Sequence, residues 1–225
     1  MTPVLEAPPR RPLASRTNGR VPPPEPPTGG GDGPERDPGP GRGLLDNVVL
    51  ATIFVIGGEI MFFAGLVFSY WVVRLAAPVW PPPLQPRLPV AVTAVNTVIL
   101  LFSSVAMIAA VRTRTRGDRR GFVRGLVLAA ALGALFLAIQ GYEWFRLVRF
   151  GLTLSSGAYG ATFYTVIGFH AAHVVAALAW LAVMVILARR GRFAGPRAAA
   201  VTACAIYWHF VVALWPILYV SVYLL

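Results

Sequence analysis

Five long apolar stretches occupy most of the sequence after residue 46 and restrict the chain to one class of protein. They cover about residues 47–73, 89–111, 125–145, 159–188 and 198–225. At about 1.5 Å of rise per residue, each stretch can cross a hydrocarbon core of about 30 Å as a helix. The chain is 56% apolar and 13% charged, whereas a soluble domain carries about 25% charged residues. The sequence therefore predicts an all-α, polytopic membrane protein, a bundle of five transmembrane helices.

The segments between these stretches are rich in proline or arginine. Residues 77–89 hold six prolines and cannot form a helix. Residues 112–124 hold six arginines and residues 189–197 hold four, whereas the first and third connections hold two each. Arginine-rich loops face the cytoplasm. We therefore expect the N-terminus to be cytoplasmic and the C-terminus to lie outside. The membrane is expected to be a bacterial-type inner (plasma) membrane.

The N-terminal segment differs in composition from the remainder of the chain. Residues 1–43 contain 12 of the 20 prolines and eight glycines without apolar periodicity, which predicts a disordered Pro/Gly/Arg-rich tail before a transmembrane domain at 44–225. The net charge of +11 and the pI near 11.1 would suggest nucleic-acid binding. Because the arginine excess lies in short loops between apolar stretches, we interpret it as an orientation signal and expect no nucleic-acid partner.

Four polar residues are predicted to lie at a similar depth in the membrane. Glu59, Gln140, His173 and His209 each fall about 11 to about 15 residues from the cytoplasmic ends of their stretches, within a slab about 6 Å thick. Lipid cannot satisfy polar groups, so we expect one buried cluster that joins four helices. Its role would be proton handling, an ion path or a lipid contact; the alternative is a neutral Glu59 carboxyl that closes one structural hydrogen bond.

The remaining polar residues are less informative. Glu143 lies nearer the outer end and is expected to reach the interface. His170 and His173 share a helix face and could ligate a metal or haem, but the sequence contains no HExxH, cysteine cluster or CxxCH. We expect no metal in this chain, and histidines that hydrogen-bond between helices instead.

Aromatic and small residues follow two further patterns. Small residues at four-residue spacing predict helix contacts in the third stretch (Gly125, Ala129, Gly133) and the fourth (Gly168, Ala172, Ala176). Trp208 and Trp215 are expected between helices. The aromatic residues near the ends of the stretches are interpreted as an interfacial belt: Tyr70, Trp71, Trp80, Tyr142, Trp144, Tyr219 and Tyr223.

Several sequence motifs resemble those of one family. GEIMFFAGLVFSYW at residues 58–71 is similar to an SE-V/I-M/L-FF-x-G segment, and LGALFLAIQGYEW at 132–144 to LGxxFxxxQxxEY. YGATFYTVIGFHAAHV at 159–174 resembles YGSTFFxxTGFHGLHV, and the last 19 residues, from YWHFVVALW onward, resemble YWHFVDxVWxxLYxxVY. Together with WPPP, VNTVILLFSS and GDRR, these motifs resemble, in order, subunit III of haem–copper terminal oxidases, in its five-helix form.

The resemblance implies a non-catalytic subunit of a proton-translocating, O2-reducing enzyme, cytochrome c oxidase. This chain would hold no redox centre and no catalytic residue; haem and copper would reside in partner subunits I and II. It would support the stability of subunit I and proton uptake, and would contact membrane phospholipids. Glu59 matches the family's intramembrane carboxylate. Glu143, His170, His173 and His209 fall on other family motifs.

Two residues depart from the family pattern, and several alternatives stay open. Gly58 stands where serine is typical, and Val212 stands where an acid is expected after WHFV. The same fold could serve a quinol oxidase or a nitric oxide reductase, since the electron donor binds other subunits. Alternatives of another class are a stand-alone transporter that uses Glu59 and a membrane enzyme with a histidine metal site.

Overall fold

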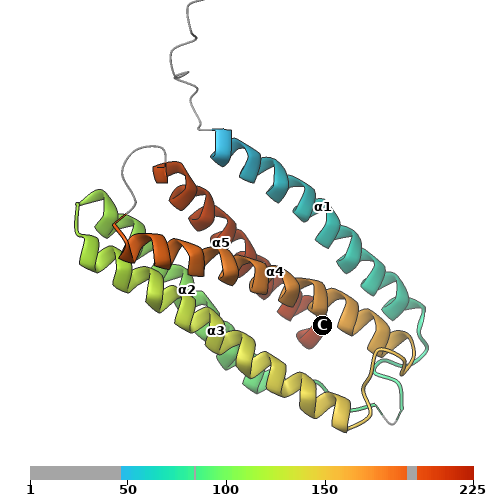
Figure 1. The fold of residues 1–225 in the computed structure, drawn as a ribbon. Helices are drawn as coiled ribbons and strands as arrows, with labels where there is room; N and C mark the ends of the chain where they lie inside the picture. Colours follow the sequence, from blue (N-terminus) through green and yellow to red (C-terminus); the bar gives the residue numbers. More distant parts are fainter. Residues whose placement is uncertain (1–46, 84, 192–196) are drawn as a thin grey trace, which may run out of the picture. The chain divides into compact units, whose positions relative to one another are not determined.

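The computed structural model describes residues 47–83, 85–191 and 197–225. The predicted disordered tail, residues 1–43, and residues 44–46 of the predicted transmembrane domain lie outside the described residues. The described part contains helices and no strand (Figure 1). The helices are α1 (Asn47–Ala76), α2 (Val90–Thr115), α3 (Arg119–Arg149), α4 (Ala158–Arg189), α5 (Arg197–Tyr219) and a π-helical turn η1 (Val220–Leu224).

All five predicted spans are present. The five helices are long and apolar enough to cross a membrane, which confirms the all-α, five-helix prediction. Proline sets the boundaries of the first connection: α1 ends at Ala76, shortly before Pro78, and α2 begins directly after Pro89. Proline lacks the backbone N–H that a helix interior requires but is tolerated where a helix begins.

The arginine-rich segment between α2 and α3 is far more helical than predicted. The turn consists of residues 116–118 only, and α3 begins at Arg119 rather than near residue 125. Gly117 adopts a φ of +76°, a conformation that favours glycine. Asp118 then caps α3, because its side chain accepts a hydrogen bond of 2.9 Å from the backbone N–H of Gly121.

The bundle is built around α5. This helix packs against α1, α2 and α4, while α2 and α3 form a tight antiparallel hairpin and α3 also packs on α4 (Figure 1). In the most apolar segment of each helix, half of the residues of α5 are buried, but only 17% of those of α1. Helix α1 therefore lies at the edge of the bundle, on α4 and α5.

One of the two predicted small-residue stripes lies in a helix contact, and the other does not. A Cβ on Gly125 would come within 2.8 Å of the Ala110 backbone, so the α2–α3 hairpin requires glycine there. A Cβ on Gly133 would collide with the Trp208 ring. The prediction for α4 is wrong, because Ala172 and Ala176 are exposed. The buried face of α4 instead carries residues such as Phe163, Ile167 and Leu181.

Part of the predicted interfacial belt is instead in the core. Tyr70, Tyr219 and Tyr223 are buried, whereas Tyr142 is 62% exposed. The hydroxyl of Tyr70 donates to the Val222 carbonyl at 3.4 Å. Tyr70, although near the end of its span, therefore contacts η1 rather than lipid headgroups. Trp208 and Trp215 are both buried between helices, as predicted.

Candidate functional site

Glu59 of α1 and His173 of α4 form a carboxyl–imidazole pair inside the membrane-spanning region. The Glu59 Oε2 atom lies 2.9 Å from His173 Nε2. Both side chains are mostly buried, with 23% and 18% exposure respectively. An isolated carboxylate at this depth is costly. The imidazole lowers that cost either by accepting a hydrogen bond from a neutral carboxyl or, when protonated, by donating one and carrying the compensating charge.

The second ring nitrogen of His173 determines its tautomer. Its Nδ1 atom lies 2.6 Å from the carbonyl oxygen of Phe169, one turn earlier on α4. A carbonyl oxygen only accepts, so Nδ1 carries a hydrogen and donates it. The Nε2 atom then either accepts the proton of a neutral Glu59 or donates its own to an ionised one. The pair can pass one proton between its two members without a change in net charge.

Aromatic rings enclose the pair on one side. The ring of Phe63 lies 5.1 Å from that of His173 in an edge arrangement, and the ring of Phe62 lies 6.4 Å away. Phe63 is itself buried. Apolar rings exclude water from this side of the pair and strengthen the interaction between its two charges or dipoles.

The four residues predicted to form one polar cluster do not form one hydrogen-bonded group. Gln140 Nε2 donates to the Tyr223 hydroxyl at 3.1 Å, and His209 Nδ1 lies 2.5 Å from the Ser104 hydroxyl. Each therefore has a partner other than Glu59 or His173. Among the described residues, the expected cluster is replaced by three separate pairs: Glu59–His173 between α1 and α4, Ser104–His209 between α2 and α5, and Gln140–Tyr223 between α3 and η1.

The length of α3 explains why Gln140 is elsewhere. Depth was counted from a predicted start near residue 125, but α3 begins at Arg119. At about 1.5 Å per residue, Gln140 lies about 32 Å from the start of α3, whereas Glu59 lies about 18 Å from the start of α1. Gln140 is therefore close to the opposite end of the bundle, beside the C-terminal turn η1.

His170 is fully buried and does not join the pair. It is 1% exposed, and neither ring nitrogen has a hydrogen-bond partner within the described residues. Its ring stacks on Trp215 at 5.0 Å. The predicted bonds between helices are thus present for His173 and His209 but not for His170. In residues 47–83, 85–191 and 197–225, no group of three or more His, Cys, Asp or Glu side chains lies close enough to hold a metal ion.

Glu143 is more buried than expected. It is 5% exposed, and both of its oxygens accept from Arg146 Nη1, at 3.2 and 3.3 Å. Arg146 lies one turn later on α3 and is about half exposed, at 47%. Glu143 is thus buried beneath a partly exposed arginine, and its expected place at the membrane interface stays a prediction.

Sequence reasoning missed the polar residues of α2. Asn96 donates to the Phe136 carbonyl of α3 at 3.0 Å, and Thr97 accepts from the Trp215 indole of α5 at 2.8 Å. Ser104 completes the series through His209. A polar residue in an apolar stretch was a visible signal, but only the bundle shows that α2 is bonded to two neighbours.

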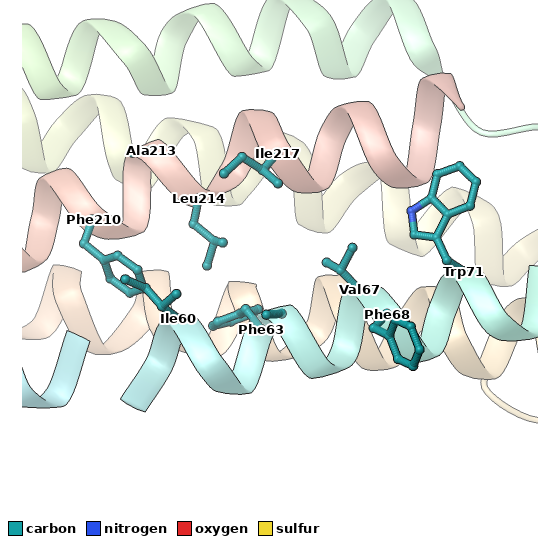
Figure 2. Close-up of a pocket in the computed structure, with 10 residues that line it drawn as sticks. Ile60, Phe63, Val67, Phe68, Trp71, Phe210, Ala213, Leu214 and Ile217 are labelled. Atoms are coloured by element: carbon teal, nitrogen blue, oxygen red, sulfur yellow. The ribbon is translucent and has the colours of Figure 1, made fainter. Parts of the chain in front are cut away.

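An apolar groove runs between α1 and α5 beside the pair. Its volume is about 660 Å³. Figure 2 shows side chains of both helices facing it, and one of them, Phe63, also contacts the His173 ring at 5.1 Å. The lining residues are Ile60, Phe63, Ala64, Val67, Phe68, Trp71, Phe210, Ala213, Leu214 and Ile217.

Comparison with known proteins agrees with the motif resemblance. Residues 43–225 match the family described as cytochrome c oxidase subunit III. A probable cytochrome c oxidase subunit 3 of Nocardia farcinica is 37% identical over 178 residues, which cover 78% of this chain and 87% of that protein. Cytochrome c oxidase subunit 3 of Corynebacterium diphtheriae is 39% identical over 180 residues, with the same coverage.

The similarity extends to vertebrate proteins. Cytochrome c oxidase subunit 3 of Sus scrofa is 34% identical over 188 residues, which cover 81% of this chain and 69% of that protein. The family match spans well over half of the chain and all five helices. The chain is thus a multi-pass membrane protein that belongs to the cytochrome c oxidase subunit III family.

Proposed function

We propose that this chain is the non-catalytic subunit III of a proton-translocating haem–copper terminal oxidase, cytochrome c oxidase, and assembles with subunits I and II. The family match over residues 43–225 is the observation that carries the proposal. The donor set of the chain agrees with it. His170 is enclosed by aromatic rings and His173 is paired with Glu59, so these two histidines do not fit as haem or metal ligands; the proposal assigns haem and copper to the partner subunits.

We assign the Glu59–His173 pair to proton uptake. It is the one carboxyl–imidazole contact within 4.0 Å among the described residues. It holds a single exchangeable proton at neutral net charge and is partly exposed at the edge of the bundle. These properties suit a group that receives a proton from one neighbour and passes it to another. In the same role, the pair would also help subunit I to remain active during turnover.

The two departures from the family pattern leave this assignment intact. Gly58 precedes Glu59, and a Cβ placed there would meet nothing within 4 Å. A serine at this site would have no packing role in this chain. Val212 is 2% exposed within the core, so the apolar residue fits its surroundings where the family pattern has an acid.

The middle of the outer face of α4, rather than its end near Arg189, is the surface that we assign to subunit I. It carries the stripe Gly168, Ala172 and Ala176, of which Ala172 and Ala176 are exposed. Small residues at this spacing allow another helix backbone to approach closely inside a membrane. The open face therefore supports assembly with a second helical membrane protein.

Two further features concern the membrane itself. The apolar groove between α1 and α5 is open to the surface, which supports contact with a phospholipid acyl chain. The arginine-rich turn after α2 and the C-terminal end of α4 lie at one end of the bundle, where Arg119 bonds to Arg189. By the positive-inside rule, this end faces the cytoplasm, with the C-terminus outside, in a bacterial-type inner membrane.

Purification of the tagged chain in mild detergent tests the proposal. Co-purification of a haem-bearing subunit I, with O2 consumption that cyanide inhibits, is expected. Turnover with reduced cytochrome c supports the cytochrome c oxidase assignment; turnover with quinol alone would replace it by a quinol oxidase. A chain that purifies alone, colourless and folded, would contradict the proposal, and proton flux in vesicles would then test the transporter alternative with Glu59→Gln.

A further inference from the structure

A second candidate binding site lies far from the Glu59–His173 pair, where α3 begins and α4 ends. A recess of about 510 Å³ opens there on the surface. Four arginines and one valine line it: Arg119, Arg120, Val123, Arg124 and Arg189. None of the lining residues is acidic, so the recess is a concave surface with only positive charge.

One of the arginines is held in a defined position. Arg119 Nη2 donates to the backbone carbonyl of Arg189 at 2.7 Å. Its guanidinium also packs over Gly191, where a Cβ would come within 3.2 Å of Nη2. Gly191 has a φ of +70°, so both its conformation and the space above it favour glycine. The C-terminal turn of α4 therefore anchors this cation before any ligand arrives.

The positive charge of the recess has no acidic partner within the described residues. Among the described residues, ion pairs join Glu143 to Arg146 and Glu59 to His173, and both pairs lie away from the recess. Asp118, the nearest acid in sequence, uses its side chain to cap α3. Four neighbouring guanidiniums repel one another, and an anion bound between them would relieve that repulsion. Guanidinium groups bind phosphate oxygens in a bidentate manner.

Exposed apolar side chains continue from the recess toward the middle of the membrane. Leu128 lies one turn after Arg124 on α3 and is 53% exposed. On the adjacent α4, Val183 and Ile186 precede Arg189 and are 50% and 49% exposed. Residues three or four apart share a helix face, so a charged recess and an apolar surface follow one another along the same two helices.

We propose that this recess binds the phosphate headgroup of an anionic phospholipid, whose acyl chains lie against the exposed surface of α3 and α4. A free phosphate would satisfy the arginines alone, but it would not use the apolar surface beside them. Basic pockets between transmembrane helices at the membrane surface are suited to such headgroups. The site is separate from the α1–α5 groove, and the proposal does not depend on the oxidase assignment.

The experiment uses the full chain, purified with whatever subunits accompany it, in nanodiscs of phosphatidylcholine with increasing phosphatidylglycerol. The variant Arg120→Gln/Arg124→Gln removes two recess arginines that are not involved in the Arg119 anchor. The matched control Arg112→Gln/Arg116→Gln removes two exposed arginines at the same end of the bundle, outside the recess. Lipid binding is measured by native mass spectrometry and by the fraction of spin-labelled phosphatidylglycerol that is immobilised.

We expect the recess variant to bind phosphatidylglycerol about 30-fold more weakly and the control to bind as the unmodified protein does. Equal loss in both variants would overturn the proposal, since it would indicate attraction by the total charge. If inorganic phosphate displaces the lipid at millimolar concentration, the ligand of the recess is a free anion and not a lipid headgroup.

A second variant guards against a folding defect. If Arg120→Gln/Arg124→Gln does not purify intact, Arg120→Lys/Arg124→Lys keeps the charge but loses the bidentate geometry. A severalfold loss of binding is then expected, and unchanged binding would overturn the bidentate headgroup site.

Discussion

The Glu59 carboxyl lies 2.9 Å from Nε2 of His173, across the α1–α4 interface, while Nδ1 of the same imidazole donates to the Phe169 carbonyl. The backbone contact orients the ring and reserves Nε2 for the carboxyl. Helix α1, the least buried of the five, is thereby joined to the bundle by a polar contact that can also hold a proton.

Replacement of the Glu59 carboxyl should separate its two roles, which are to join α1 to the bundle and to hold a proton. Glu59→Gln retains the size of the side chain and an amide that can donate to His173 Nε2, so stability should change by less than about 1 kcal/mol. The rate of proton uptake during turnover should fall. Stopped-flow measurement of proton uptake checks this, with Glu143→Gln as the control, because that acid is paired with Arg146. Wild-type uptake in the Glu59 variant would contradict the proposed role.

The α2–α3 hairpin depends on close backbone approach at Gly125. In Gly125→Ala, the new Cβ would come within 2.8 Å of the Ala110 Cα, and the helices must separate at a cost of about 1–3 kcal/mol. The melting temperature in detergent should fall. Gly141→Ala is the control, because nothing lies within 4 Å of its Cβ position; this variant should be neutral or slightly more stable. Equal melting temperatures for both variants would rule out the close approach.

The end of the bundle at which η1 lies contains a buried hydrogen bond between α3 and η1. Tyr223→Phe leaves the buried Gln140 amide without the hydroxyl to which it donates at 3.1 Å, which should cost about 1–3 kcal/mol. Denaturant titration measures the change. In the double variant with Gln140→Leu, the loss should be smaller than the sum of the single losses; additive losses would contradict a shared bond. Tyr142→Phe, at a position 62% exposed, is the control.

The open face of α4 should be required for assembly rather than for folding of the chain. A Cβ at Gly168 meets nothing within 4 Å, so Gly168→Leu should fold but keep a partner helix at a distance. The yield of co-purified haem should fall. Gly141→Leu makes the same change at an open position on α3 and should assemble normally. Normal haem content in the Gly168 variant would place the partner on another face.

The proposed orientation can be measured by labelling on intact cells. In a Cys204→Ser background, Arg116→Cys and Ser155→Cys place single thiols at exposed positions on opposite ends of the bundle. A membrane-impermeant maleimide should label position 155 from outside and position 116 only after the cells are opened. The reverse pattern would invert the assignment.

The fold could largely be derived before the structure was known. The five spans follow from runs of apolar residues, and their interruption by Pro78 and Pro89 follows from the missing N–H of proline. The start of α3 could not be derived in the same way. An arginine-rich segment is equally compatible with a loop and a helix, and the Asp118 cap with the Gly117 turn decided in favour of the helix.

The candidate site was less predictable. Glu59, His173 and His209 were recognised as buried polar groups, and each has a polar partner on another helix. The expected contact of Gln140 with them was wrong, because depth along one helix depends on where that helix begins. The small-residue stripe of α4 was also misplaced, since spacing defines a face but not what the face contacts.

What could be known without coordinates was therefore local: which segments span the membrane, and which polar residues lie within it. Hydrophobicity and length are properties of a segment by itself. Which side chains meet was determined by assembly of the bundle, because the rotation and relative height of each helix follow from packing against its neighbours. The pairing of Glu59 with His173, of Ser104 with His209 and of Gln140 with Tyr223 depends on that packing.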